Sequence, residues 1–208
     1  PLWMAGGPGT LLWVDCDRSD LHWRRGVAQS RAELAVEAGV DHLGDGLCEL
    51  LARAEEHGQD DEARDPALAR WQGCGTTLVA LLFAADDPRR AALVHTGDSR
   101  AYLLRGHTLT RITRDHSLVQ ALVESGTITE GEAIGHPHAN VITRAIGAAG
   151  ELEMDKVSAR IAPGDLFLLC SDGLFKALPE TDIATVLAAG EGAQALVEAA
   201  PVRGARDN

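Results

Sequence analysis

The chain has 208 residues, of which 45% are hydrophobic and 24% are charged, a composition that fits one globular domain with a core of its own. Its formal net charge of −12 argues against a nucleic acid or an anionic membrane as partner, because the phosphates would repel it. We recognise no signal peptide and no apolar stretch long enough to span a bilayer, so we expect no membrane insertion. The four cysteines lack C-x-x-C spacing, which favours reduced thiols and a cytoplasmic setting.

The first third of the chain predicts one strand followed by helix. The apolar run over 10–16 has the pattern of a strand and ends at Asp17. Apolar residues at helical spacing favour a helix over 27–56, which its glycines would divide into two. The acidic segment 57–66 is typical of a solvated loop.

From residue 74 the pattern changes to short apolar or alternating runs separated by turns, which indicates an antiparallel meander. The predicted strands of this part cover 76–84, 91–95, 101–104 and 109–112. Two short helices over 117–124 and 129–133 follow, each beginning with a capping hydroxyl. An irregular loop over 135–147 completes this part.

The last quarter of the chain predicts two more strands, 157–161 and 166–170, and then helices over 179–188 and 193–200. Strands and helices that come in separate groups indicate an α+β fold rather than an alternating parallel sheet. We therefore expect a single domain over 1–208, a β-sandwich of antiparallel sheets with helices on the outside.

Several acids lie where predicted strands end. The buried run over 166–170 stops at Asp172, Asp17 and Asp98 lie at similar strand ends or turns, and Asp207 follows the last predicted helix. A carboxylate at the end of a buried strand is unfavourable unless it is paired or bound to a cation. Oxygen ligands of this kind suit Mg²⁺ or Mn²⁺, and two such ions could activate water for attack on a phosphoryl group. Spacing alone leaves open the simpler reading, in which each acid belongs to an ordinary turn.

Six short motifs, in a fixed order, carry the strongest functional signal. They are Gly75-Thr76-Thr77-Leu78, Gly97-Asp98-Ser99-Arg100-Ala101-Tyr102, Asp115-His116-Ser117-Leu118-Val119, Val141-Ile142-Thr143-Arg144-Ala145-Ile146-Gly147, Cys170-Ser171-Asp172-Gly173-Leu174 and Arg206-Asp207-Asn208. Over about residues 74–208 this order resembles the type 2C metal-dependent protein phosphatases, in particular their compact bacterial members. A single motif would be weak evidence, because Gly-Asp-Ser is a common turn, but the ordered set is very specific.

The resemblance implies a sandwich of two antiparallel sheets flanked by α-helices, with a small helical flap at about 115–147 that contains His116, Ser117 and Arg144. It also implies hydrolysis of phosphoserine and phosphothreonine in proteins by a metal-activated water. The partner would be a phosphorylated protein, the product of an opposing Ser/Thr kinase, and we expect the phosphatase to be a monomer.

The resemblance further implies two Mn²⁺ or Mg²⁺ ions, with a third ion as an open alternative. By motif match, Asp172 and Asp207 would bind the first ion, and Asp98 together with Asp172 would support the third, weaker one. Asp17 would bridge the first two ions, and Arg18 would offer its backbone carbonyl.

The first metal loop departs from the family pattern Asp-Gly-Met-Gly-Gly-His. Counting without gaps puts the aspartate at Asp17 and the histidine at His22, which could act as a general acid. Arg18, Asp20 and Leu21 replace glycines, and Asp15 is a competing ligand if the strand is shifted by two residues. This departure motivates an alternative, a pseudophosphatase that binds a partner or regulates it, and a related hydrolase of small phosphate esters is a third reading.

Both ends of the sequence depart from the family as well. We find no counterpart of the family's N-terminal strand, which carries a phosphate-binding arginine, or of the strand that should follow Asn208. We therefore expect either an excised fragment or a degenerate gene product.

Overall fold

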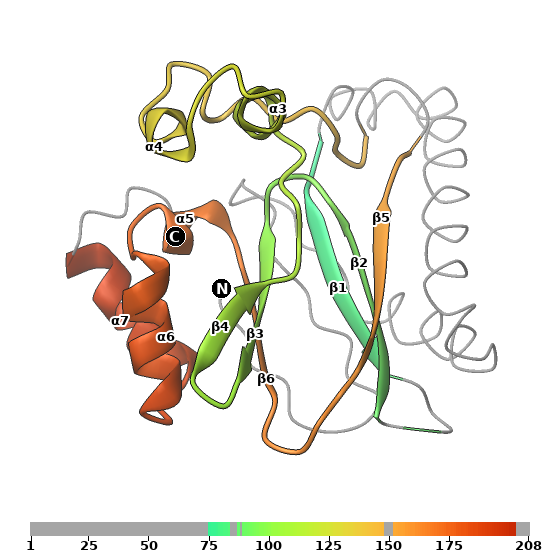
Figure 1. Ribbon diagram of the computed structural model, residues 1–208, viewed down its shortest axis with the longest axis vertical. Helices are drawn as coiled ribbons and strands as arrows, with labels where there is room; N and C mark the ends of the chain where they lie inside the picture. The colour runs from blue at the N-terminus through green and yellow to red at the C-terminus, as the bar shows by residue number, and fades with distance from the viewer. Residues whose placement is uncertain (1–74, 84–86, 88, 148–151, 203–208) are drawn as a thin grey trace, which may run out of the picture.

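The computed structural model describes residues 75–83, 87, 89–147 and 152–202 (Figure 1). The strand expected over 10–16, the helix over 27–56 and the acidic loop after it lie outside these residues. Among the helices in the described ranges, none combines the length and the apolarity needed to cross a membrane.

Two antiparallel sheets, each of three strands in the described part of the chain, form the sandwich (Figure 1). The first sheet has the order β1-β2-β5 and consists of β1 (Leu78–Phe83), β2 (Arg90–Thr96) and β5 (Asp155–Arg160). The second has the order β4-β3-β6 and consists of β3 (Arg100–Arg105), β4 (Thr108–Arg111) and β6 (Leu166–Cys170). The predicted α+β sandwich is confirmed. The predicted meander is wrong, because β2 and β3 belong to different sheets and the four strands form two separate hairpins, β1–β2 and β3–β4.

Strand alternation divides the hydrophobic side chains of the second sheet between two cores. Ala101 and Leu169 face the first sheet and pack in a cluster with Val79, Leu81 and Leu93. Their neighbours in β3 and β6 point to the opposite face, which the C-terminal helices cover. The buried residues of this second core are Tyr102, Leu104, Leu168, Cys170, Leu174, Leu178, Ile183, Leu187, Leu196 and Ala200.

Three helices cover the outer face of the second sheet: α5 (Asp172–Phe175), α6 (Glu180–Ala188) and α7 (Ala193–Val202) (Figure 1). The two longer ones agree with the predicted helices. The short α5 was not predicted, because an aspartate followed by glycine reads as a turn; burial of Leu174 against the sheet stabilises this single helical turn instead.

Two helices lie across one end of the strands and bury no residue: α3 (Leu118–Glu124) and α4 (Glu130–Ala133) (Figure 1). Ser117 caps α3 by accepting a hydrogen bond from the Gln120 amide, and Thr129 forms a capping box with Glu132 at α4. Both caps were predicted from the sequence. With no fully buried residue, these helices are held by partial burial of α3 and by polar contacts.

His95, near the end of β2, is 1% exposed and its ring stacks on that of His116 with centroids 4.8 Å apart. Its Nδ1 is buried and has no hydrogen-bond partner in the described part of the chain. Burial, and then the nearby His116, lower the pKa of His95 to about 4. The folded protein therefore holds this imidazole in its neutral form.

The turn between β2 and β3 depends on Gly97, whose φ of +98° lies in the left-handed region. A Cβ at this position would overlap Cγ2 of Thr77 and would lie 2.6 Å from its Cβ. The turn therefore packs its backbone directly against the residue that precedes β1.

We predict that Gly97→Ala destabilises the chain more than Gly164→Ala, measured by urea unfolding. Both glycines have positive φ, so both variants pay about 1–2 kcal/mol for the conformation. Only Gly97 meets a neighbour, since nothing lies within 4 Å of a Cβ at Gly164, and overpacking adds about 1–3 kcal/mol. Equal losses in the two variants would contradict the close packing of this turn.

We predict that His95→Gln weakens the loss of stability on acidification. Between about pH 6.5 and pH 4 the unfolded chain binds a proton at His95 that the folded chain does not, so falling pH favours unfolding. The variant lacks this proton, and its free energy of unfolding should change less with pH, by up to about 1.4 kcal/mol per pH unit. The exposed His107→Gln is the control, and an unchanged slope in His95→Gln would refute the assignment.

Candidate active site

The pairing of β3 with β6 brings two acids that are distant in sequence to the same end of the sandwich. Arg100, at the start of β3, pairs with Cys170, at the end of β6. Asp98 lies two residues before Arg100, and Asp172 lies two residues after Cys170. Asp98 follows the turn at Gly97 and Asp172 begins α5, so both acids lie just beyond the paired ends of the two strands, close enough for the Asp172 carboxylate to raise the pKa of Asp98.

The Asp98 carboxyl lies near a second negative charge, the Asp172 carboxylate. Asp98 is 9% exposed, and this burial raises the pKa of its carboxyl. The Asp172 carboxylate raises the pKa further, whereas the Lys176 ammonium lowers it. A divalent cation would remove this conflict, since it stabilises the ionised form of both groups. Carboxylate oxygens are also the ligands that Mg²⁺ and Mn²⁺ prefer, so the two side chains fit the metal that the motifs imply.

The turn that carries Asp98 is fixed from both sides. Thr77 Oγ1 and Ser99 Oγ are hydrogen-bonded at 2.8 Å. On the other side, the Gly97 amide donates to His116 Nδ1 at 3.2 Å, and the His116 amide donates to the Gly97 carbonyl at 2.9 Å. His116 was predicted as a flap residue near the substrate, and the structure gives it this positioning contact.

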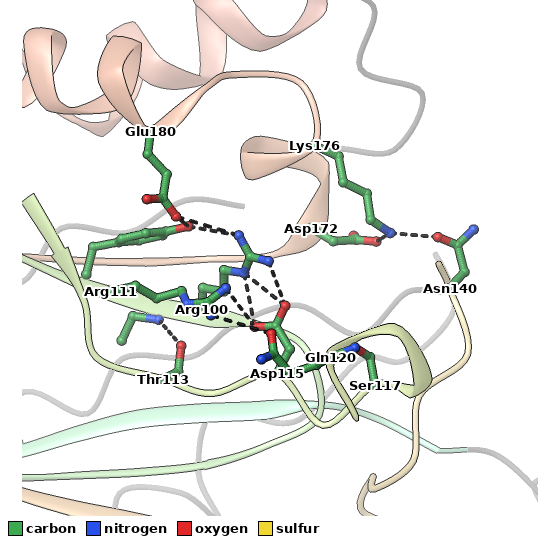
Figure 2. Close-up of polar contacts among 12 residues, drawn as sticks. Arg100, Arg111, Thr113, Asp115, Ser117, Gln120, Asn140, Asp172, Lys176 and Glu180 are labelled. Atoms are coloured by element: carbon green, nitrogen blue, oxygen red, sulfur yellow. Dashed lines mark hydrogen bonds and ion pairs between the residues drawn. The ribbon is translucent and has the colours of Figure 1, made fainter. Parts of the chain in front are cut away.

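Arg100 joins the same turn to the beginning of the flap through a paired carboxylate (Figure 2). Its Nε and Nη2 donate to Asp115 at 3.0 and 2.6 Å, and the Asp115 side chain is 9% exposed. The guanidinium also lies 3.7 Å from the ring centre of Phe175 and donates to the Tyr102 hydroxyl at 3.3 Å. Bidentate pairs of this kind are among the strongest and most directional in proteins. Asp115 belongs to a recognised motif, yet the sequence alone assigned it no role.

The base of the flap is closed by backbone hydrogen bonds between its two ends. The Leu118 amide donates to the Val141 carbonyl at 2.9 Å, and the Thr143 amide donates to the His116 carbonyl at 2.8 Å. Ser117, predicted as a flap residue, sits in this closure as the helix cap and forms a bridge with Ile142. Residues 116–118 and 141–143 therefore act as one unit.

Arg144, the third predicted flap residue, lies at the same base. Its side chain pairs with Asp155 at 3.1 Å and with Glu153 at 3.0 Å, and its Nη1 lies 3.4 Å from His116 Nε2. These contacts tie the flap to the start of β5. The structure thus gives Arg144 a structural contact, and its contact with substrate stays a prediction.

Asp172 begins α5 and is paired with a lysine on the next turn. Lys176 Nζ donates to Asp172 Oδ2 at 2.5 Å and to Asn140 Oδ1 at 2.7 Å, as Figure 2 shows. The pair is partly exposed, with 40% of the Lys176 side chain and 29% of the Asp172 side chain open to solvent. Neither Lys176 nor Asn140 was predicted as part of the site, because nothing local in the sequence indicates that the flap reaches α5.

A second group of potential metal ligands lies beside the flap base. The ligand atoms of His95, His116 and Asp155 lie within 4.8 Å of one another. The two imidazole rings are nearly parallel, at 20°, so their lone pairs do not point at a common centre. Arg144 forms an ion pair with Asp155. Burial raises the pKa of Asp155 and the hydrogen bond with His116 lowers it, and the net pKa lies below the ordinary value. We interpret this group as a buried polar cluster that supports the flap.

Four predicted site residues lie outside the described ranges: Asp17, Arg18, His22 and Asp207. Their convergence on Asp98 and Asp172 stays a prediction.

Sequence comparison finds relatives of one kind, although no family model matches the chain. The chain is 39% identical over 140 residues to "Serine/threonine phosphatase stp" of Listeria monocytogenes, covering 65% of this chain and 54% of that protein. It is 36% identical over 234 residues to "Serine/threonine protein phosphatase PstP" of Mycobacterium tuberculosis, covering 96% of this chain and 44% of that protein. The chain therefore spans about half the length of the curated relatives it matches.

Solved structures agree in fold. The serine/threonine phosphatase of S. agalactiae superposes with a TM-score of 0.72 at 29% identity, covering 88% of this chain and 79% of that one. The Mycobacterium tuberculosis phosphatase PstP/Ppp gives a TM-score of 0.68 at 34% identity, covering 88% of this chain and 80% of that one. A PstP catalytic domain in complex with two manganese ions gives 0.65 at 32% identity, with 88% and 80% covered.

Identity above 30% over four fifths of a solved relative, together with the same antiparallel sandwich, is more than a shared fold. The chain belongs to the bacterial branch of the type 2C, or PPM-type, metal-dependent serine/threonine protein phosphatases.

Proposed function

We propose that this chain hydrolyses phosphoserine and phosphothreonine in proteins, with Mn²⁺ or Mg²⁺ held at the end of the sandwich that carries Asp98 and Asp172. The observation that carries the proposal is the β3–β6 pairing, which brings the two acids to the same end of the sandwich, where the Asp172 carboxylate raises the pKa of Asp98. The names of the relatives support the reaction, and the manganese complex of one of them supports the choice of metal. The substrate would be a protein phosphorylated by a Ser/Thr kinase.

When bound, the cations would supply the Lewis acidity and the activated water that phosphoester hydrolysis needs. The residues of the chain then hold the cations and orient the groups around them. Asp98 and Asp172 supply carboxylate oxygens, and the bonds of Thr77 and His116 to the turn keep Asp98 in place. Arg100 fixes Asp115, so the flap begins at a constant distance from the acids. A site that holds its ligands rigidly loses less free energy to reorganisation during the reaction.

The remaining members of the proposed site come from the motifs. Asp17 and Asp207 would complete the acidic ligands, Arg18 would offer its backbone carbonyl, and His22 would donate a proton to the serine or threonine oxygen that leaves phosphorus. Ser117 lies on the closed base of the flap, where a protein substrate would pass. A non-catalytic role for the chain finds no support in the comparisons.

We predict that Asp172→Asn lowers Mn²⁺-dependent phosphate release from a phosphothreonine peptide by at least about 100-fold, because even outer ligands of a metal site are worth 10–100-fold. The exposed acid Glu198 on α7 gives the matched control, and Glu198→Gln should retain full activity. Thermal unfolding should show both variants folded. Equal rates for Asp172→Asn and the unchanged chain would eliminate the proposal.

We predict that a chelator abolishes phosphate release and that Mn²⁺ or Mg²⁺ restores it. Calorimetric titration of the chelator-treated chain with Mn²⁺ should resolve two binding events, and Asp98→Asn should weaken binding because one carboxylate ligand is lost. If Mn²⁺ does not bind at millimolar concentration, the chain is a partner-binding pseudophosphatase instead.

A further inference from the structure

The acidic end of the sandwich carries one of the rarest residues of the chain. Lysines and arginines together number 19, and only Lys156 and Lys176 are lysines. A lysine ammonium is a point charge on a flexible stem, whereas an arginine fork holds a carboxylate in a fixed geometry. Within the described ranges, arginine holds carboxylates such as Asp115 and Asp165. Beside Asp172 lies a lysine instead, a flexible point charge without the fixed fork.

The ammonium of Lys176 makes two contacts that belong to different parts of the molecule. One is the Asp172 carboxylate, which lies four residues earlier at the start of α5, and the other is the side-chain carbonyl of Asn140 in the flap (Figure 2). A single charged group therefore links a proposed metal ligand to the flap. We call this arrangement the Lys176 bridge.

The Asn140 contact lies at the edge of the closed flap base, one residue before Val141, whose carbonyl accepts from the Leu118 amide. Helices α3 and α4 bury no residue, and the segment before Asn140 is ordered by short turns, with the Ala139 amide donating to His136 and the Val141 amide to His138. Asn140 itself is exposed. Contacts of this kind set the position of a segment with small free energies, so a change at Lys176 is enough to shift it.

We propose that Lys176 and a divalent cation compete for Asp172, and that metal binding thereby releases the flap from α5. The inference rests on the proposed metal site. A cation held by Asp172 repels the ammonium, because like charges on one carboxylate disfavour each other. The lysine stem then moves away, and Asn140 loses its donor. The flap is held close to α5 when Lys176 neutralises Asp172 and opens toward substrate when the metal does so.

Thermodynamic reciprocity turns the competition into a measurable coupling. If the metal weakens the Lys176 bridge, the bridge must weaken metal binding by the same factor. Lys176→Met keeps the length of the stem and removes the charge, so it should tighten Mn²⁺ binding by about 5–10-fold in calorimetric titration. Lys156→Met removes the other lysine charge, on β5, and should leave the dissociation constant unchanged.

The conformational part is tested by hydrogen–deuterium exchange of peptides that cover residues 136–143, with and without Mn²⁺. In the unchanged chain, Mn²⁺ should speed exchange of the Ala139 and Val141 amides. In Lys176→Met exchange should be fast before Mn²⁺ is added and should not respond to it. Asn140→Ala should give the same fast exchange, with a smaller change in Mn²⁺ affinity because Lys176 still faces Asp172.

Each result bears on the proposal. Lys176→Met could bind Mn²⁺ more tightly while Mn²⁺ leaves the exchange of the flap amides in the unchanged chain unaltered. Lys176 would then act only as a nearby charge, and the bridge would be refuted. Equal Mn²⁺ affinity in both chains would also refute it, while the phosphatase function would stand. Absence of Mn²⁺ binding in both chains would remove the bridge and the proposed function together.

Discussion

The site depends on one constraint, the register in which β3 pairs with β6. Arg100 pairs with Cys170, so Asp98 and Asp172 both lie just beyond the paired ends of the strands, and a slip of one residue would reverse the face on which each side chain of the strand lies. The hydrophobic pattern prevents that slip. Ala101 and Leu169 must face the first sheet, while Tyr102 and Leu168, both fully buried, must face the helices. The packing of two cores therefore fixes the position of two carboxylates.

The flap is attached to the start of β3, the strand end that this register aligns with β6. Arg100 lies beside the turn that carries Asp98 and pairs with Asp115. His116 forms two hydrogen bonds with Gly97, accepting one at its ring and donating one from its amide. The base of the flap is closed by Leu118 and Thr143, whereas its helices bury nothing. A rigid base and a weakly held outer part are what a segment needs if it is to move over a site without disturbing it.

The sequence predicted the parts of the structure that are local. Strand alternation and capping residues predicted the sandwich and the helices, and the metal-binding role of Asp98 and Asp172 stays a prediction. What it could not predict depends on cross-strand register or on tertiary contact. Asp155 and Lys156 lie before the predicted strand 157–161, yet they belong to β5 because they pair with His95 and Val94. The turn α5 and the contact between Lys176 and Asn140 form only once the sheet brings residues 36 apart in sequence together.

The most direct test of the account is anomalous diffraction from crystals of the chain grown with Mn²⁺. The account predicts anomalous density at the end of the sandwich, bonded to Asp172 and to Asp98 directly or through water. Manganese density at His95, His116 and Asp155 instead, or its absence beside Asp172, would contradict the claim that the β3–β6 register builds a metal site.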